Sequence, residues 1–412
     1  MDIDIEFVAY STVWFTGIIL MLVLFLVTVG NKLAPAGNVK ININDGKKEI
    51  ILSPGTDLLS ALANENIFLP SACGGGGTCA MCKAIVTDGG GEILPTETGH
   101  IGKKDQKLGM RLACQVKVKQ DMKIEVEDDV LEIKKFEGIV RSNKNVATFI
   151  KEFIVDLPEG VDLNFKAGGY IQIDVPEYDI DFGRDFEIED EYRGDWDHFK
   201  FFDIKHKNTT PIFRAYSMAN HPAEGNCVML NIRIATPPPP LNGKAFPPGL
   251  CSTYVFSKKP GDKVTISGPF GEFFAKDTPR EMCYIGGGAG MAPMRSHIFD
   301  LFHTKNTNRI VNFWYGARSV REMFYDDDFK GIEDKWSNFK YHVALSNALE
   351  SDNWTGFTGF IHEVVRDEYL LKHKDPQEIE YYLCGPPMMI SAVSKMLYDL
   401  GVEEDMIDFD EF

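Results

Sequence analysis

Four cysteines of this 412-residue chain have the order and spacing of ligands for an iron-sulfur cluster. Cys73, Cys79 and Cys82 form a C-x5-C-x2-C loop, and Cys114 follows further along the chain. Four thiolates in this order are typical of a [2Fe-2S] cluster. The glycines between Gly74 and Gly77 can take positive φ values, which lets backbone N–H groups approach the cluster sulfides. The spacing therefore predicts a one-electron redox centre.

Zinc binding and disulfide bonds are the alternative uses of clustered cysteines. Structural zinc sites usually combine two short C-x2-C units, so zinc is the less favoured ligand. A disulfide framework fits a chain of this length poorly, because the other cysteines are scattered, a pattern that suits a reducing compartment. These other cysteines are Cys227, Cys251, Cys283 and Cys384.

A second group of residues has the chemistry that a flavin such as FAD requires. In Arg214-Ala-Tyr-Ser217, the arginine can pair with a pyrophosphate, and Tyr216 can pack on the isoalloxazine ring. Ser217 can bond to the polar atoms of the ring. The motif alone is weak, because a core strand with a surface arginine has the same pattern.

Two later segments strengthen the flavin prediction. One is the predicted strand at residues 231–236. The other, at residues 249–254, places a glycine and a hydroxyl at the start of a helix, where free N–H groups attract phosphate. Their candidate cofactor-binding residues are Asn231, Arg233, Gly249 and Ser252.

The next motif is typical of a nicotinamide nucleotide site. A predicted strand leads through a glycine-rich turn into a helix, although the glycines depart from the strict G-x-G-x-x-G pattern. Arg318 ends the following strand and can bind a ribose or a phosphate, whereas an ordinary surface arginine is the alternative. The candidate glycines of the turn are Gly286, Gly287, Gly288 and Gly290.

Cys384 ends another predicted strand, at the edge where parallel sheets bind ligands. A lone buried cysteine is usually inert packing. Because Gly385 and Pro386 follow it at the strand end, Cys384 can instead lie against the nicotinamide. Cys384 is therefore a candidate contact of the nicotinamide, as Ser217 is of the flavin.

The N-terminal segment has the composition of a membrane anchor. No charged residue occurs between Phe7 and Asn31, and at about 1.5 Å per residue a helix of this length can span a bilayer. A cleaved signal peptide is the alternative, but its first residues would be basic, whereas here they are acidic. Basic residues follow the segment and predict that the rest of the chain is cytoplasmic. They are Lys32, Lys40, Lys47 and Lys48.

Four parts are predicted to position these groups. The length and the 44% hydrophobic composition require more than one core, and the net charge of -18 argues against a nucleic-acid partner. We expect a transmembrane helix in residues 1–33 and an α+β, β-grasp ferredoxin domain in 34–130. An antiparallel β-barrel for FAD is expected in 131–275, and an α/β, Rossmann-like NADH domain in 276–412.

Two local predictions concern a helix and an insertion. A helix should run from an N-cap at Thr56 to Glu65. The acidic stretch 177–205 is expected to be a solvated loop of the barrel domain. Docking to a partner subunit is the alternative for this stretch because of its interleaved aromatic residues. They include Trp196, Phe199, Phe201 and Phe202.

Taken in order, these motifs resemble the F subunits of sodium-translocating NADH:quinone oxidoreductase, a respiratory complex of many bacteria. The resemblance covers nearly the whole chain, and the N-terminal span with the domain order narrows it from the wider ferredoxin-NADP reductase superfamily. It implies that NADH reduces FAD, that the [2Fe-2S] cluster accepts single electrons, and that partner subunits pass them to quinone while sodium is exported. It also implies a location at the bacterial inner membrane, with the redox domains on the cytoplasmic side.

The resemblance also assigns two roles at the flavin. Cys384 is similar to the family's cysteine beside the hydride-transfer site, so Cys384 and Ser217 are expected to flank the passage of hydride from nicotinamide C4 to flavin N5. A C-terminal aromatic is expected to stack on the flavin. The family often continues with glycine after that aromatic, so both Phe412 and Phe409 are candidates. The preference for NADH over NADPH follows from the resemblance alone.

Two other functions fit parts of the sequence. The reductase component of a multicomponent oxygenase has the same ferredoxin, flavin and NADH order, but such components are normally soluble. A membrane-anchored electron carrier or docking subunit without turnover would have a degenerate nucleotide site. The intact glycines from Gly286 to Gly290, together with Cys384, argue against that second alternative.

Overall fold

The computed structural model describes residues 5–33, 37–71, 73–131, 133–237 and 246–411. The chain forms two compact units. The first comprises the residues up to 69 together with 75–131, and the second comprises 70–74 with the residues from 132 onward. The division into four parts remains a prediction.

The first unit contains a five-stranded mixed sheet in the order β2-β1-β5-β3-β4. The parallel pair of β1 and β5 lies between antiparallel neighbours, and the buried leucines of α2 pack in its core. This arrangement confirms the expected α+β fold. The strands are β1 (Val39–Ile43), β2 (Lys48–Leu52), β3 (Lys83–Asp88), β4 (Met110–Leu112) and β5 (Met122–Glu125), and the helices are α2 (Leu58–Asn64), α3 (Pro95–Thr98) and α4 (Lys103–Lys107).

Helix α2 begins later than the sequence predicts. The Asp57 carboxylate accepts the backbone N–H of Ser60 at 2.9 Å, so Asp57 is the N-cap instead of Thr56. The Thr56 carbonyl is hydrogen-bonded to the Val118 N–H at 2.9 Å and belongs to the preceding loop. A carboxylate is also favoured at this position by the helix dipole.

Helix α1 (Ile5–Leu33) contains the segment predicted to span a membrane. Within the ranges that the structure describes, no helix is long and apolar enough to cross a bilayer. The predicted transmembrane helix is therefore not confirmed.

The second unit begins with an antiparallel sheet in the order β11-β8-β13-β6-β7-β12. A β-bridge between Met218 and Leu230 joins the two ends of this order, so the sheet closes on itself around the core. The expected β-barrel is confirmed. Its elements are β6 (Lys134–Ala147), β7 (Ile150–Asp156), β8 (Tyr170–Val175), β11 (Ile212–Ser217), β12 (Cys227–Arg233), β13 (Lys263–Phe270) and helix α7 (Leu250–Phe256).

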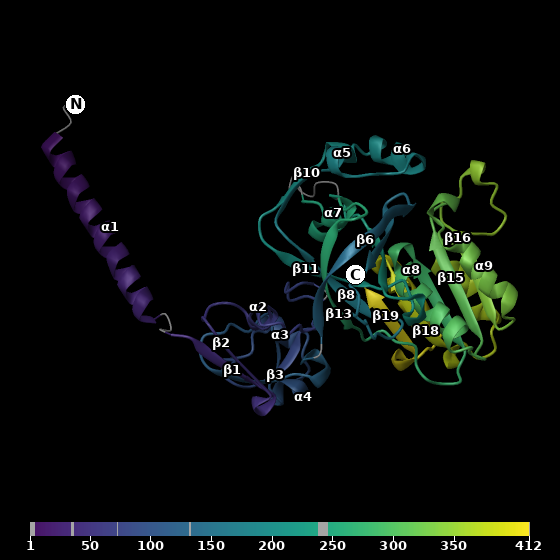
Figure 1. Ribbon diagram of the computed structural model, residues 1–412, viewed down its shortest axis with the longest axis horizontal. Coiled ribbons are helices and arrows are strands. Elements are labelled where there is room, and N and C mark those ends of the chain that lie inside the picture. The colour runs from purple at the N-terminus through teal and green to yellow at the C-terminus, as the bar shows by residue number, and fades with distance from the viewer. Residues whose placement is uncertain (1–4, 34–36, 72, 132, 238–245, 412) are drawn as a thin grey trace. The chain divides into compact units, whose positions relative to one another are not determined.

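The same unit contains a parallel sheet in the order β17-β16-β15-β14-β18-β19 (Figure 1). Tyr284 and Phe313 belong to the core shared with α8 and α9, whereas Ile285 and Trp314 belong to the core shared with α10 and α11. This alternation places helices on both faces, as predicted. The elements are β14 (Met282–Gly287), α8 (Met291–Phe299), β15 (Val311–Ala317), α9 (Asp326–Lys335), β16 (Phe339–Leu345), β17 (Phe357–Thr358), α10 (Ile361–Glu368), β18 (Glu380–Gly385), α11 (Pro387–Asp399) and β19 (Ile407–Glu411).

The acidic stretch 177–205 is folded, so the solvated-loop prediction is wrong for its apolar side chains. It contains β9 (Tyr178–Asp181), α5 (Phe182–Asp185), α6 (Asp190–His198) and the start of β10 (Lys205–Asn208) (Figure 1). Trp196 has no exposed surface, and its Nε1 donates to the Thr148 carbonyl at 2.8 Å. The charged side chains lie largely on the outer side of the insertion. Their number made the apolar pattern of the inner side hard to recognise in the sequence.

Trp196→Ala should lower the free energy of unfolding by about 3–5 kcal/mol, because a large cavity forms in the barrel core. Urea unfolding followed by circular dichroism measures the loss. Phe199→Ala is the matched control, since 49% of the Phe199 side chain is exposed, and it should cost less than about 1 kcal/mol. Equal losses in both variants would contradict a core role for Trp196.

Candidate functional site

The two buried cysteines of the predicted cluster site lie at the ends of paired strands. Cys82 precedes β3 and Cys114 follows β4. Because β3 and β4 are antiparallel neighbours, the Ala113 N–H can donate to the Cys82 carbonyl at 2.7 Å. Cys73 and Cys79, in the preceding loop, are partly exposed.

The thiols of Cys82 and Cys114 are hydrogen-bonded to each other. This hydrogen bond, followed by burial, raises the pKa of Cys82 well above its usual range, so metal binding must displace its proton. Among the described residues, no group of three or more His, Cys, Asp or Glu side chains that could hold a metal ion is present. Adjacent thiols suit a [2Fe-2S] cluster, in which each iron takes its own cysteine pair. The thiol pair therefore fits the predicted binuclear cluster.

Three of the four glycines in the cysteine loop have the positive φ values that the sequence predicts. Gly74, Gly75 and Gly77 have φ values of +62°, +90° and +78°. A Cβ on Gly77 would lie 2.7 Å from Nε2 of Gln115, so a larger residue would also collide with that side chain. Gly77 therefore requires glycine for both reasons, whereas Gly75 requires it for its φ value.

Strand β11 carries the predicted flavin residues Arg214, Tyr216 and Ser217. Arg214 and Tyr216 are half-buried and share one face of the strand, since side chains alternate along it. The Tyr216 hydroxyl is hydrogen-bonded to the thiol of Cys251, which lies on α7. The strand thus presents a guanidinium and an aromatic ring side by side, as a flavin site requires.

Gly249 and Ser252 connect α7 to the chain that follows β12. The Ser252 hydroxyl accepts the Ala235 N–H at 3.1 Å and donates to the Gly249 carbonyl at 3.3 Å. The Gly249 N–H donates to the Ala235 carbonyl at 2.8 Å. Both residues therefore fix the start of the helix, and phosphate binding there remains a prediction.

The two candidates on β12 have different surroundings. Asn231 is buried, and its Nδ2 donates to the Tyr325 hydroxyl at 2.8 Å, so it joins the barrel to the parallel sheet. Its Oδ1 is buried without a partner in the described part of the chain. Arg233, at the end of the strand, is exposed and lines the neighbouring cleft.

A cleft of about 470 Å³ lies between one end of the barrel and the carboxyl ends of the parallel strands. This is the edge of a doubly wound sheet at which nucleotides bind. The cleft contains the predicted residues Gly287, Gly288, Arg318 and Pro386, as well as Arg233. The structure thus brings together residues that the sequence assigned separately to flavin and nicotinamide binding.

Gly290 and Gly385 allow the glycine-rich turn to approach the end of β18. A Cβ on Gly290 would lie 2.2 Å from the Cys384 carbonyl oxygen. A Cβ on Gly385, where φ is +156°, would lie 2.9 Å from the Gly287 carbonyl oxygen. Side chains at either position would separate the two loops that form the floor of the cleft.

Ser217 and Cys384 are connected through Asp410, a residue that the sequence analysis missed. The Ser217 hydroxyl donates to the Asp410 Oδ2 at 2.6 Å, and Asp410 is directly opposite Cys384 in the pairing of β18 with β19. Burial raises the pKa of Asp410, while the hydrogen bond from Ser217 opposes that rise. The only signal in the sequence is the acidic residue within an alternating C-terminal strand.

The Cys384 side chain is fully buried. Burial, and then the charge of Asp410, raise the pKa of its thiol well above the usual range. The raised pKa favours the neutral thiol of Cys384, which suits packing against a ligand.

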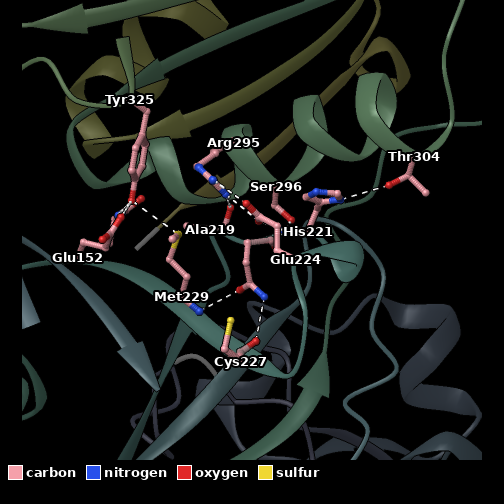
Figure 2. Close-up of polar contacts among 12 residues, drawn as sticks. Glu152, Ala219, His221, Glu224, Cys227, Met229, Arg295, Ser296, Thr304 and Tyr325 are labelled. Atoms are coloured by element: carbon pink, nitrogen blue, oxygen red, sulfur yellow. Dashed lines mark hydrogen bonds and ion pairs between the residues drawn. The ribbon is translucent and has the colours of Figure 1, made fainter. Parts of the chain in front are cut away.

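A polar network joins the barrel to helix α8 beside this site (Figure 2). The Arg295 guanidinium donates to both carboxylate oxygens of Glu224, at 2.8 and 2.7 Å. It also donates to the Ala219 carbonyl at 2.9 Å, two residues after Ser217. The chain leaving β11 is thus tied to the helix that follows the glycine-rich turn.

The folded insertion contributes to the cleft as well. Asp195 of α6 lines the cleft and forms an ion pair with Arg321, which lines it from the parallel-sheet side. Glu322, the next residue, accepts hydrogen bonds from the Thr148 backbone N–H and hydroxyl. The insertion therefore helps to hold the barrel and the nucleotide side of the cleft together.

Of the two aromatics predicted to stack on the flavin, Phe409 lies within the described residues. Phe412 lies outside the described residues. Phe409 is on β19, opposite Leu383, and 55% of its side chain is exposed. Both assignments remain predictions.

Three family models match the chain. The 2Fe-2S iron-sulfur cluster binding domain matches residues 41–119, the oxidoreductase FAD-binding domain matches 197–274, and the oxidoreductase NAD-binding domain matches 284–395. The first match favours the iron-sulfur cluster over zinc.

Several relatives are similar to this chain over almost its full length. A protein of Idiomarina loihiensis, named as the F subunit of Na(+)-translocating NADH-quinone reductase, is 56% identical over 399 residues, 97% of each chain. Proteins with the same name from Neisseria meningitidis serogroup C and Methylococcus capsulatus are each 54% identical. The alignments cover 97% of this chain and 98% and 97% of those relatives.

Solved structures show the same fold at lower identity. A cytochrome P450 reductase of Amycolatopsis matches with a TM-score of 0.62 and 21% identity, over 91% of this chain and 98% of that one. The ferredoxin reductase in carbazole 1,9a-dioxygenase matches with a TM-score of 0.58 and 25% identity, over the same shares.

Asp410→Asn should slow flavin reduction by NADH about ten- to hundredfold while FAD stays bound. A small misplacement of the reacting groups lowers the rate of a reaction by about this factor. Stopped-flow absorbance of the flavin measures the rate. Asp408→Asn is the matched control on the same strand, where Asp408 pairs with Lys276 at 2.7 Å. Equal rates of flavin reduction in the two variants would show that Asp410 has no special role at the site.

Proposed function

We propose, from the premise that the chain belongs to the family of Na(+)-translocating NADH-quinone reductase F subunits, that it is the NADH-oxidising, electron-input subunit of such a complex. The family models supply the cofactors for this role, since they cover FAD, NAD and a [2Fe-2S] cluster. NADH gives up an electron pair as hydride, whereas an iron-sulfur cluster accepts single electrons. Bound flavin supplies the conversion between the two.

The observation that carries this proposal is the connection from Ser217 through Asp410 to Cys384, which lies two residues before Pro386 in the lining of the cleft. It joins the barrel residue predicted to contact the flavin with the strand end predicted to contact the nicotinamide. Groups that must hold two rings in contact need this kind of rigid support.

The residues around the cleft have distinct proposed tasks. Arg214 and Tyr216 hold the flavin, and Arg233 and Arg318 neutralise nucleotide phosphates in the cleft. Ser217 donates a hydrogen bond at the edge of the flavin, and Asp410 orients it. The neutral Cys384 thiol fills the space beside the nicotinamide and excludes water from it.

The cysteine loop is the proposed exit for electrons. Cys73, Cys79, Cys82 and Cys114 would hold the cluster, and the positive-φ glycines leave its sulfides open to backbone N–H groups. The further acceptors are other subunits of the complex, in keeping with the name of the relatives.

Membrane attachment through residues 1–33 is part of the proposal. The uncharged segment from Phe7 to Asn31 supports it, as do the apolar side chains on α1, several of which are exposed. The acidic residues before the segment and the lysines after it support a cytoplasmic location for the redox domains.

The reductase of a multicomponent oxygenase remains the second candidate function. The likeness to the ferredoxin reductase in carbazole 1,9a-dioxygenase favours it, because that structure covers 91% of this chain. The relatives named as F subunits are more than twice as similar in sequence, at 56% against 25% identity. Copurification from native membranes separates the two, since the partners would form a quinone reductase in one case and an oxygenase in the other.

Cys79→Ala should abolish the [2Fe-2S] signal while NADH oxidation by an artificial two-electron acceptor continues, because hydride transfer precedes the cluster. Electron paramagnetic resonance measures the cluster, and dye reduction measures NADH oxidation. The wild-type flavin should bleach when NADH is added. A wild-type chain that binds FAD but does not bleach would refute the proposed function.

Deleting residues 1–33 should move the chain from the membrane fraction to the supernatant while NADH oxidation by an artificial acceptor is retained. Cell fractionation followed by immunoblotting and the dye assay measures both outcomes. A deletion variant that remains in the membrane fraction at the wild-type level would contradict anchoring by this segment.

A further inference from the structure

The side-chain amide of Gln115 lies beside one of the proposed cluster ligands. Its Nε2 donates to Sγ of Cys114 at 3.5 Å, and its Oε1 accepts a hydrogen bond from the Thr96 hydroxyl at 3.1 Å. A cysteine that ligates iron carries no proton, so only the N–H end of the amide can face that sulfur. The hydrogen bond with Thr96 holds the amide in the required orientation.

A buried ion pair fixes the short helix that carries Thr96. Glu97 has no exposed surface, and its two carboxylate oxygens accept hydrogen bonds from Arg111 at 2.9 and 2.7 Å. The same carboxylate accepts the backbone N–H of Leu112 at 3.0 Å, two residues before Cys114. One anchor therefore holds both the helix of Thr96 and the strand that leads to the cysteine.

The charge state of Glu97 favours this anchor. Burial alone would raise its pKa, but hydrogen bonds from Arg111 and from two backbone N–H groups hold the pKa below its usual value. The carboxylate is therefore ionised at neutral pH, and the ion pair with Arg111 is charge-assisted.

Gly77 brings the cysteine loop against the other side of the amide. A Cβ on Gly77 would lie 2.7 Å from the Gln115 Nε2, so the absence of a side chain lets the amide fit between the loop and Cys114. The amide is thus confined by Thr96, Gly77 and Cys114 within the first unit.

We propose that Gln115 raises the reduction potential of the [2Fe-2S] cluster by donating a hydrogen bond to the Cys114 sulfur, and that Thr96 is the residue that orients it. The inference rests on the proposed function, because it requires the cysteines to hold this cluster. Reduction adds one electron, and part of the added negative charge resides on the ligand sulfurs. A donor at the sulfur stabilises the reduced form more than the oxidised form, so the cluster accepts electrons more readily.

The test is a redox titration of the full-length chain, with the reduced cluster followed by electron paramagnetic resonance. Gln115→Leu removes the donor and should shift the midpoint potential to a more negative value. Gln115→Glu should shift it further, because the carboxylate adds negative charge and cannot donate. Thr96→Val leaves the amide in place without its orienting contact and should give a smaller shift in the same direction.

Gln120→Leu is the matched control, since Gln120 is an exposed glutamine of the same unit, and its midpoint should equal that of the wild type. Wild-type midpoints in Gln115→Leu and Gln115→Glu would overturn the proposal. If those variants assemble no cluster, Thr96→Val decides, and an unshifted midpoint overturns it. Flavin bleaching by NADH is recorded in every sample, so a failure of the proposed function appears separately, as a wild-type chain without bleaching or without a cluster signal.

Discussion

The partly buried ion pair between Arg295 and Glu224 is the contact on which the geometry of the nucleotide site depends. Burying the Arg295 guanidinium and part of the Glu224 carboxylate costs free energy, and the bidentate geometry together with the hydrogen bond to the Ala219 carbonyl offsets that cost. Burial opposes the charge on Glu224, yet the hydrogen bonds from Arg295 hold its pKa below the usual value. The pair fixes the chain after Ser217 to helix α8, so the barrel and the parallel sheet keep one relative position at the cleft.

With that position fixed, Ser217 can reach Asp410, although the two residues are 193 positions apart in the sequence. Asp410 lies opposite Cys384 because β19 adds in parallel register to the edge of β18. The close approach of Gly290 and Gly385 at the same strand end completes the floor of the cleft. The same insertion that buries Trp196 in the barrel places Asp195 at the cleft, where Asp195 pairs with Arg321. The insertion therefore both stabilises the barrel and contributes to the lining of the cleft.

The first unit has a different requirement, because an iron-sulfur cluster needs thiolates at fixed positions and hydrogen-bond donors near their sulfurs. The buried pair of Glu97 and Arg111 serves as its internal anchor. Strand pairing brings Cys82 and Cys114 together, and Gln115 follows directly in the sequence. Because the ion pair holds these elements in place, residues of the first unit itself determine the electrostatic surroundings of the cluster site.

The sequence by itself determined the cofactors and the fold classes, because ligand spacing, glycine patterns and strand alternation are local properties of the chain. It predicted Cys82, Cys114, Gly287 and Arg318 as site residues, but not Asp410, which meets Ser217 and Cys384 only once β19 pairs with β18. It predicted Asn231 as a cofactor contact, and the structure adds that the Asn231 amide donates to the Tyr325 hydroxyl. It also treated 177–205 as solvated, since the exposed charges conceal an apolar face that becomes visible only when the barrel packs against it. Tertiary structure decided these points because each depends on contacts between segments distant in sequence.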